Sequence, residues 1–161
     1  MSIPLSNILF LCIGNICRSP FAHGLFDKLT ADQGLMRFKA RSAGLLALPG
    51  NAATSLAQHV AAEYSVDLAG HEANAVSREL VGWSDLILVM EKSQEDMLLT
   101  DFPEANGRVR LMRHFARFGS RERGIADPYG LNYEAYRFCY LDIEDAVTGL
   151  IEFLAASKTK S

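Results

Sequence analysis

Cysteine is scarce in this sequence, which has three copies, at Cys12, Cys17 and Cys139. An odd number of cysteines, with no Cys-x-x-Cys pair and no cysteine and histidine ligand spacing, excludes a secreted disulfide framework and a structural zinc site. Reduced thiols are typical of the cytosol. The sequence therefore predicts a cytoplasmic protein.

The chain also lacks a basic excess and a long hydrophobic run. Its formal net charge is −3, with acidic and basic residues interspersed through most of the chain, whereas binding to the phosphates of nucleic acid needs a basic face. The N-terminal apolar stretch is short, follows no charged segment and runs into a loop. We therefore expect no nucleic-acid partner, no signal peptide and no membrane insertion.

The sequence contains enough apolar residues for one hydrophobic core, since 49% of the 161 residues are hydrophobic. We expect one domain over residues 1–156 and a frayed tail over residues 157–161. Short apolar runs alternate with helical patterns, as in a parallel α/β sheet. The expected strands are 8–11, 38–43, 86–90 and 109–112, and the expected helices are 20–30, 54–64, 93–99 and 133–155. The first helix is expected to have Ser19 as N-cap and Pro20 at its first position.

The first strand leads into the segment that carries the most chemistry, the run from Cys12 through Arg18 and Ser19 that precedes Pro20. A loop between a buried strand and a helix N-terminus directs backbone N–H groups toward a bound anion. A thiol there is stabilised as the nucleophilic thiolate by the helix N-terminus and by Arg18, whose planar guanidinium can bind two phosphate oxygens. Ser19 can donate its hydroxyl to the thiolate. The loop predicted to hold a phosphate-sized dianion comprises Ile13, Gly14, Asn15, Ile16, Cys17, Arg18 and Ser19.

The glycine-bent curvature of this loop is expected to depend on Gly14, and Asn15 is expected to take a left-handed conformation. Phosphoryl transfer to Cys12 also needs an acid that protonates the leaving oxygen. Asp127, in the late turn-rich stretch 117–130 and stiffened by Pro128, is the predicted acid and can afterwards activate water. The carboxyl ends of parallel strands, where Cys12, Gly44 and Glu91 emerge, are where this site is expected.

Other candidate residues have two interpretations each. Cys17 is either a small structural side chain or the partner of Cys12 in a reversible disulfide that protects the nucleophile. His71 either braces the loop by hydrogen bonding or satisfies itself locally, and Glu91 either orients its neighbours or is solvated. Cys139 lies on the apolar stripe of the last helix and is expected in the core.

With these residues the chain resembles the low-molecular-weight protein tyrosine phosphatases, whose signature Cys-x5-Arg-[Ser/Thr] is matched by Cys12, Arg18 and Ser19. The segments 42–44, 70–71, 85–91 and 127–129 fall in the family's order. The resemblance implies a single three-layer α/β domain, with a four-stranded parallel sheet between helices, and a phosphocysteine intermediate without metal or cofactor. It also implies Cys12 as nucleophile, Arg18 as phosphate binder and Asp127 as proton donor.

The stretch 42–48 lacks the aromatic residue that animal members carry, so Leu45, Leu46 or Leu48 is expected as a pocket wall, with Leu46 as our assignment and Tyr129 at the pocket mouth. These features resemble the bacterial members that dephosphorylate autophosphorylated tyrosine kinases in capsule and exopolysaccharide production. The resemblance implies that the partner is a phosphotyrosine protein, for example a bacterial tyrosine kinase. We expect the chain to be a monomer.

Relatives on the same fold define the alternatives. Thiol-relay arsenate reductases need two cysteines beyond the loop, and this chain has Cys139 alone there. Protein arginine phosphatases typically have threonine where Ile16 stands, so Ile16 favours phosphotyrosine. A phosphotyrosine-binding module without catalysis is the remaining alternative, but such a module needs no nucleophile.

Overall fold

A four-stranded parallel sheet forms the centre of the molecule in the computed structural model, which describes residues 5–157. Its strand order is β2-β1-β3-β4. The strands are β1 (Asn7–Cys12), β2 (Lys39–Gly44), β3 (Leu86–Val89) and β4 (Val109–Leu111). In the parallel register, Leu11 of β1 pairs with Ala43 of β2 and with Val89 of β3. The predicted parallel α/β sheet is confirmed.

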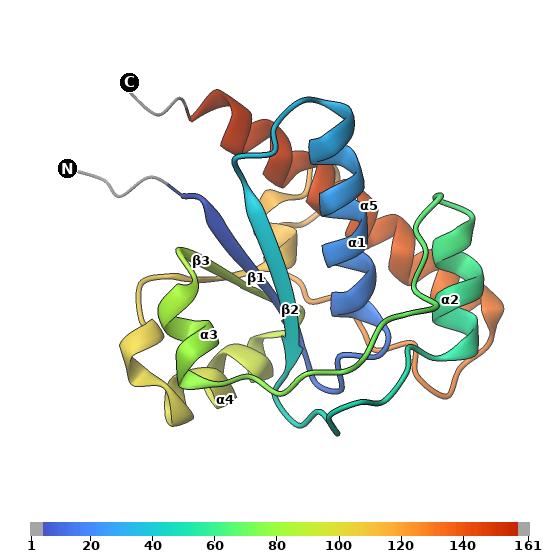
Figure 1. Cartoon of the computed structure of the whole chain (residues 1–161), viewed down its shortest axis with the longest axis horizontal. Coiled ribbons are helices and arrows are strands. Elements are labelled where there is room, and N and C mark those ends of the chain that lie inside the picture. Colours follow the sequence, from blue (N-terminus) through green and yellow to red (C-terminus); the bar gives the residue numbers. More distant parts are fainter. Residues whose placement is uncertain (1–4, 158–161) are drawn as a thin grey trace.

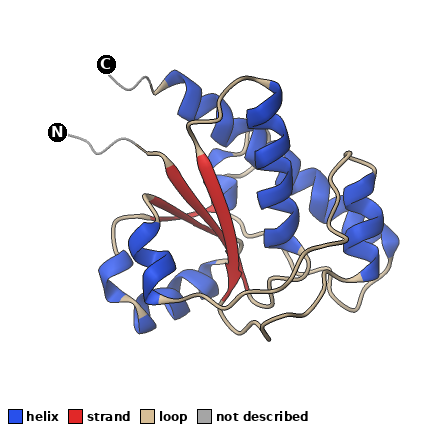
Figure 2. Ribbon diagram, in the orientation of Figure 1, coloured by secondary structure: helices blue, strands red, loops and turns tan. Residues whose placement is uncertain are grey.

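Helices cover both faces of the sheet (Figures 1 and 2). One layer contains α1 (Arg18–Asp32), α2 (Ser55–Ala62) and α5 (Tyr133–Ala156). The opposite layer contains α3 (Arg78–Trp83) and α4 (Lys92–Asp101), followed by the short helix η1 (Pro103–Ala105). The helix η2 (Met112–Phe115) follows β4.

The period of two along each strand explains the layers, because successive side chains point to opposite faces of a sheet. Ile8 and Phe10 belong to the core shared with α1, α2 and α5, whereas Leu9 and Leu11 belong to the core shared with α3 and α4. Every one of these four side chains is fully buried. A strand buried on both faces has the continuous apolar sequence that predicted it.

Two features of the helices correct the predictions. Helix α3 was not expected; its N-cap is Ser77, whose side chain accepts a hydrogen bond from Leu80 N at 3.1 Å. Helix α1 begins at Arg18 with Cys17 as N-cap, and no side chain caps it. The expectation of Ser19 as N-cap is therefore wrong, because Ser19 lies inside the first turn and its hydroxyl faces the thiol of Cys12.

The last helix runs to Ala156, with Ser157 as its C-cap. Of the predicted tail, residues 158–161 lie outside the described residues. Among the helices of residues 5–157, none has both the length and the apolar character needed to cross a membrane. The carboxyl ends of β1, β2 and β3 meet at the same edge of the sheet, and this edge carries the candidate site.

Candidate active site

Cys12 ends β1 and lies at the bottom of a cavity of about 190 Å³. The cavity is lined by Cys12, Ile13, Gly14, Ile16, Cys17, Arg18, Asp127 and Tyr129. Two donors reach the sulfur: the Asn15 N–H lies 3.3 Å from Cys12 Sγ, and Ser19 Oγ lies 3.0 Å from it. Both donors stabilise a negative charge on the sulfur, as a nucleophilic thiolate requires.

Asn15 holds the loop in this shape. It is fully buried and has a φ of 57°, so its predicted left-handed conformation is confirmed. Its Oδ1 accepts a hydrogen bond from Asn74 N at 2.9 Å, which directs its Nδ2 toward Ser19 Oγ at 2.8 Å and Ser42 Oγ at 3.1 Å. Ser19 Oγ accepts from Asn15, so its single hydroxyl proton is donated elsewhere: Cys12 Sγ lies 3.0 Å away, closer than the alternative acceptor, the carbonyl of Ala43 at 3.4 Å.

The glycine that the loop requires most is Gly44, at the end of β2. A Cβ there would lie 2.6 Å from the carbonyl oxygen of Ile13, a distance that no side chain tolerates. A Cβ on Gly14, in contrast, would meet the side chain of Ile16 at an ordinary 3.4 Å. The close packing of β2 against the loop therefore excludes a side chain at Gly44, whereas the curvature at Gly14 does not exclude one there.

Arg18 is 1% exposed and is held by two other segments of the chain. Its Nη1 donates to Glu91 Oε1 at 2.6 Å and to the carbonyl of Ile125 at 2.7 Å. Burial lowers the pKa of Arg18, but the hydrogen bond to Glu91 and the negative charges of Cys12 and Asp127 outweigh burial, so the pKa is raised. Arg18 is therefore a cation at neutral pH.

The remaining edge of the guanidinium is directed at the acid. Arg18 Nη2 lies 3.6 Å from Asp127 Oδ2, and Arg18 Nε is buried without a hydrogen-bond partner among the described residues. An unpaired buried donor is costly in a folded protein. Nε and Nη2 form the side of the guanidinium that binds two oxygens of one anion, so this edge is suited to a phosphate.

Asp127 lies at the rim of the cavity, with its side chain 45% exposed. Its Oδ1 accepts a hydrogen bond from Tyr129 N at 3.0 Å, which fixes the turn. Tyr129 is 61% exposed and lines the cavity, as predicted for the pocket mouth. Leu46 does not fulfil its predicted place: it is 67% exposed and is not among the lining residues. Its backbone N–H donates to the carbonyl of Ile13 at 2.9 Å, and Ile13, Ile16 and Tyr129 form the apolar wall instead.

His71 contacts the loop, as the first of its two interpretations required. Its Nε2 lies 2.6 Å from the carbonyl oxygen of Asn15, so Nε2 carries a proton and donates it. Burial lowers the pKa of His71 below 6.5, although the hydrogen bond to Asn15 acts in the opposite direction. The imidazole is therefore neutral at pH 7.

Cys17 lines the cavity, and its sulfur lies 3.3 Å from Tyr136 Oη. Burial raises the pKa of the Cys17 thiol, which keeps this thiol protonated at neutral pH. Both cysteines are free thiols in the structure. The second interpretation of Cys17, a reversible disulfide with Cys12, therefore stays a prediction. Cys139 is buried in the core on α5 as expected, and burial raises the pKa of its thiol as well.

The structure thus brings Cys12, Arg18 and Asp127 together and adds groups that sequence reasoning missed or left open. Glu91 binds Arg18, as the first of its interpretations required, and it is also the helix-entry residue of α4, with a side chain that is 38% exposed. Ser42, Tyr136 and the backbone of Ile125 were missed. No local signal marks the missed groups, because each comes from a different part of the chain and meets the loop only after folding.

A thiol flanked by hydrogen-bond donors, facing the free edge of a buried arginine and a carboxylic acid, defines a phosphatase that acts through a cysteine. The chain belongs to the low-molecular-weight protein tyrosine phosphatase family. A sequence profile described as "Low molecular weight phosphotyrosine protein phosphatase" matches residues 7–160.

Individual relatives agree with this family. The chain is 40% identical over 139 residues to the low molecular weight protein-tyrosine-phosphatase Wzb of Escherichia coli strain K12, covering 86% of this chain and 88% of the relative. It is 32% identical over 147 residues to the protein-arginine-phosphatase of Geobacillus stearothermophilus, covering 91% and 95%. The structure of the tyrosine phosphatase Wzb from Escherichia coli K30 in complex with sulphate superposes with a TM-score of 0.83 and 34% identity, covering 93% of this chain and 99% of that one.

Proposed function

We propose that this chain hydrolyses phosphotyrosine in two steps, with Cys12 as the nucleophile. The observation that carries the proposal is the shared cavity: it is lined by Cys12, by Asp127 and by Arg18, whose Nε has no hydrogen-bond partner among the described residues. The K30 relative was solved in complex with sulphate, a tetrahedral dianion like phosphate, which is consistent with a protein that binds such anions.

In the first step the Cys12 thiolate attacks phosphorus and forms the sulfur–phosphorus bond while the bond from phosphorus to the phenolic oxygen breaks. Asp127, in its protonated form, gives its proton to that oxygen, and tyrosine leaves. Arg18 Nε and Nη2 bind the equatorial oxygens, whose charge develops in the transition state. Arg18 is already held by Glu91 and Ile125, so it needs no reorganisation during the reaction.

In the second step a water molecule attacks the phosphocysteine, and the Asp127 carboxylate accepts a proton from this water. The phosphorus–sulfur bond breaks, inorganic phosphate leaves and Cys12 returns as thiolate. The Ser19 hydroxyl, 3.0 Å from the sulfur, stabilises this leaving group.

The apolar lining by Ile13, Ile16 and Tyr129 favours an aromatic phosphoester. We assign phosphotyrosine as the substrate and Ile16 as the residue that disfavours phosphoarginine. The physiological partner in this proposal is an autophosphorylated bacterial tyrosine kinase of exopolysaccharide production. We place the reaction in the cytoplasm and the enzyme as a monomer, with exposed Leu46 contacting the protein substrate beside the cavity.

A colorimetric assay with an aryl phosphate in the presence of EDTA tests the chemistry. We expect full wild-type turnover in EDTA and no turnover by Cys12→Ser, which should still bind substrate. Cys139→Ser is the matched control and should remain active. Turnover by Cys12→Ser close to wild type would end the proposal, and binding of phosphotyrosine without turnover by wild type would support a binding module instead.

Matched phosphotyrosine and phosphoarginine peptides test the substrate class. We expect a higher kcat/KM on phosphotyrosine and expect Ile16→Thr to reduce this preference. A wild-type preference for phosphoarginine would contradict the assignment while leaving the cysteine mechanism intact.

A further inference from the structure

The acid Asp127 lies on an irregular segment, residues 116–132, which connects η2 to α5 and is called the acid loop below. A proton donor must lie within hydrogen-bond distance of the leaving oxygen, and an error of about 1 Å in such a position can cost about a hundredfold in rate. A segment without regular structure does not hold a side chain to that accuracy by itself. Its attachments to the rest of the molecule therefore decide where Asp127 stands.

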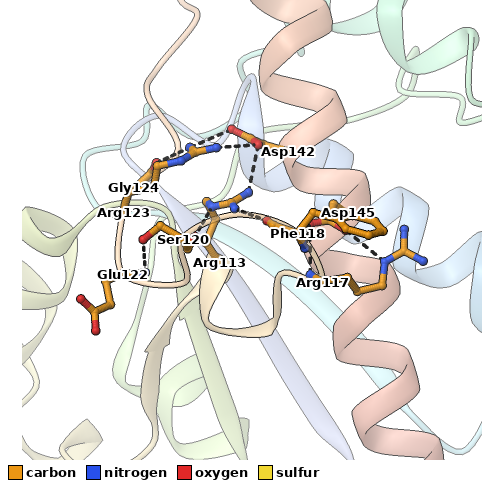
Figure 3. A network of polar contacts seen from close by, with 9 residues as sticks. All are labelled: Arg113, Arg117, Phe118, Ser120, Glu122, Arg123, Gly124, Asp142 and Asp145. Atoms are coloured by element: carbon orange, nitrogen blue, oxygen red, sulfur yellow. Dashed lines mark hydrogen bonds and ion pairs between the residues drawn. The ribbon is translucent and has the colours of Figure 1, made fainter.

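One carboxylate outside the cavity binds two arginines, one in this loop and one in the helix just before it (Figure 3). Asp142, on α5, accepts from Arg123 Nη1 at 3.0 Å and from Arg123 Nη2 at 3.0 Å, so the pair is bidentate. Asp142 Oδ1 also accepts from Arg113 Nη1 at 2.9 Å. Arg123 belongs to the acid loop, whereas Arg113 belongs to η2.

Arg113 extends the same network along the loop backbone. It is 2% exposed, and it donates from Nε to the carbonyl of Ser120 at 2.9 Å and from Nη2 to the carbonyl of Phe118 at 2.6 Å. Because a buried guanidinium needs a countercharge, Asp142 compensates Arg113 as well as binding Arg123. Asp142 itself is fixed, since its neighbours Tyr140 and Ile143 on α5 are fully buried.

The attachment at Arg123 is followed directly by the residues that reach the cavity. The added Cβ of a side chain at Gly124 would lie 3.0 Å from the carbonyl of Met90, so the loop runs close against the end of β3 there. Ile125 is buried, and its N–H donates to the carbonyl of Met90 at 2.8 Å. Asp127 follows two residues later.

We infer that the Asp142–Arg123 pair is a positioning device for the proton donor: it fixes the acid loop so that Asp127 stands over the leaving oxygen. The inference rests on the proposed function and adds two positioning residues that contact neither substrate nor the reacting atoms. Asp145, on the same helix, binds Arg117 and the N–H of Phe118 at the far end of the loop. It therefore provides a matched control.

The first test compares kcat/KM on phenyl phosphate, whose leaving group needs a proton, with kcat/KM on 2,4-dinitrophenyl phosphate, whose leaving group does not. Arg123→Met should lower kcat/KM about tenfold on phenyl phosphate and leave the dinitrophenyl substrate nearly unchanged. Asp142→Asn should show the same pattern. Asp145→Asn should show no difference between the two substrates.

Two further measurements separate positioning from a merely structural role. The inhibition constant of inorganic phosphate reports on Arg18 and the cysteine loop, and it should be unchanged in Arg123→Met. In an Asp127→Asn background, Arg123→Met should cause no further loss on phenyl phosphate, because the group that it positions is gone. The side chain of Arg123 is half-exposed, so this variant tests the inference even where Asp142→Asn fails to fold.

An equal loss on both substrates, a weakened phosphate inhibition, or an additive loss in the Asp127→Asn background would overturn the inference. Each of these results would leave the proposed function standing. An Asp127→Asn variant that loses no more on phenyl phosphate than on the dinitrophenyl substrate would instead remove the acid role of Asp127, and with it the proposed mechanism.

Discussion

The hydroxyl of Ser19 is the one side-chain donor within hydrogen-bond distance of Cys12 Sγ among the described residues. In the second step of the mechanism the sulfur departs as thiolate, and a hydrogen bond to a charged group contributes about 1.5–3 kcal/mol. Ser19→Ala should therefore lower kcat by about tenfold or more. Rapid mixing should reveal a fast release of phenol followed by a slow phase, because the phosphocysteine accumulates.

Ser42→Ala is the control for this prediction, since Asn15 Nδ2 donates to Ser42 as it does to Ser19. Each variant removes one acceptor of that amide, but only Ser19 reaches the sulfur. An equal loss of kcat in both variants, or no burst with Ser19→Ala, would contradict the role of the hydroxyl as a donor to the leaving sulfur.

His71 adds a pH dependence to the stability of the loop. Burial holds its pKa below 6.5 in the folded protein, so the unfolded chain binds more protons just below pH 6.5. The contribution of His71 to the free energy of unfolding is therefore complete above pH 6.5 and is lost as the pH falls toward the folded-state pKa. His71→Gln keeps an N–H that can donate to Asn15 but does not titrate, and it should remove this loss.

Urea unfolding between pH 5 and 7 measures the effect. The free energy of unfolding of wild type minus that of His71→Gln should rise with pH. Parallel pH curves for wild type and His71→Gln would exclude His71 as the source of the dependence.

At the scale of the elements, α5 approaches η2 so closely that one of its residues must lack a side chain. A Cβ on Gly149 would lie 1.8 Å from the carbonyl oxygen of Phe115, which is backbone and cannot rotate away. Gly149→Ala should therefore lower the free energy of unfolding by about 3 kcal/mol, as overpacked sites do. Gly82→Ala, at an exposed position of α3 with nothing within 4 Å, should instead raise it by about 0.5–1 kcal/mol. Urea midpoints of the two variants provide the measurement, and similar midpoints would contradict the packing argument.

The elements also show what the sequence can and cannot predict. The central strands β1 and β3 were predictable because a strand buried on both faces is a continuous apolar run. The edge strands β2 and β4 contain exposed residues and give a weaker signal. Helix α5 was predictable because it is long and amphipathic. Helix α3 was missed because six residues give less than two turns of periodicity. Only its N-cap Ser77, with Glu79 in the first turn, marked it.

The candidate site also contains some residues that the sequence predicts and others that it does not. Cys12, Arg18 and Ser19 were predictable because they belong to one short segment, so their relative positions in the loop follow from their spacing in the sequence. Asp127 was predictable from its turn and from the chemistry that the loop lacked. Ser42 and Asp142 were not predictable, because their roles depend on tertiary contacts with residues far along the chain.

At the scale of the whole molecule, Arg18 connects its own segment to two parts of the chain that are distant in sequence. Its own segment follows β1, its carboxylate partner Glu91 follows β3, and its carbonyl partner Ile125 lies on the acid loop. An anion that binds the free edge of Arg18 is thus held only by the folded molecule. Binding to the folded state alone stabilises it by an amount that grows with ligand concentration.

Inorganic phosphate should therefore raise the free energy of unfolding of wild type, by about 2.7 kcal/mol at a concentration one hundred times its dissociation constant. Urea unfolding with and without phosphate, at constant ionic strength maintained with chloride, measures this gain. Arg18→Met should lose most of the gain, whereas Arg78→Met, which removes a surface arginine with a 69% exposed side chain, should retain it. Hydrogen exchange should show the added protection at residues 13–17 and 123–127 together, because the first segment lines the cavity that binds phosphate and the second is bound to Arg18 through the carbonyl of Ile125. A gain that survives in Arg18→Met, or protection confined to one of the two segments, would show that phosphate binds elsewhere or that Arg18 does not couple them.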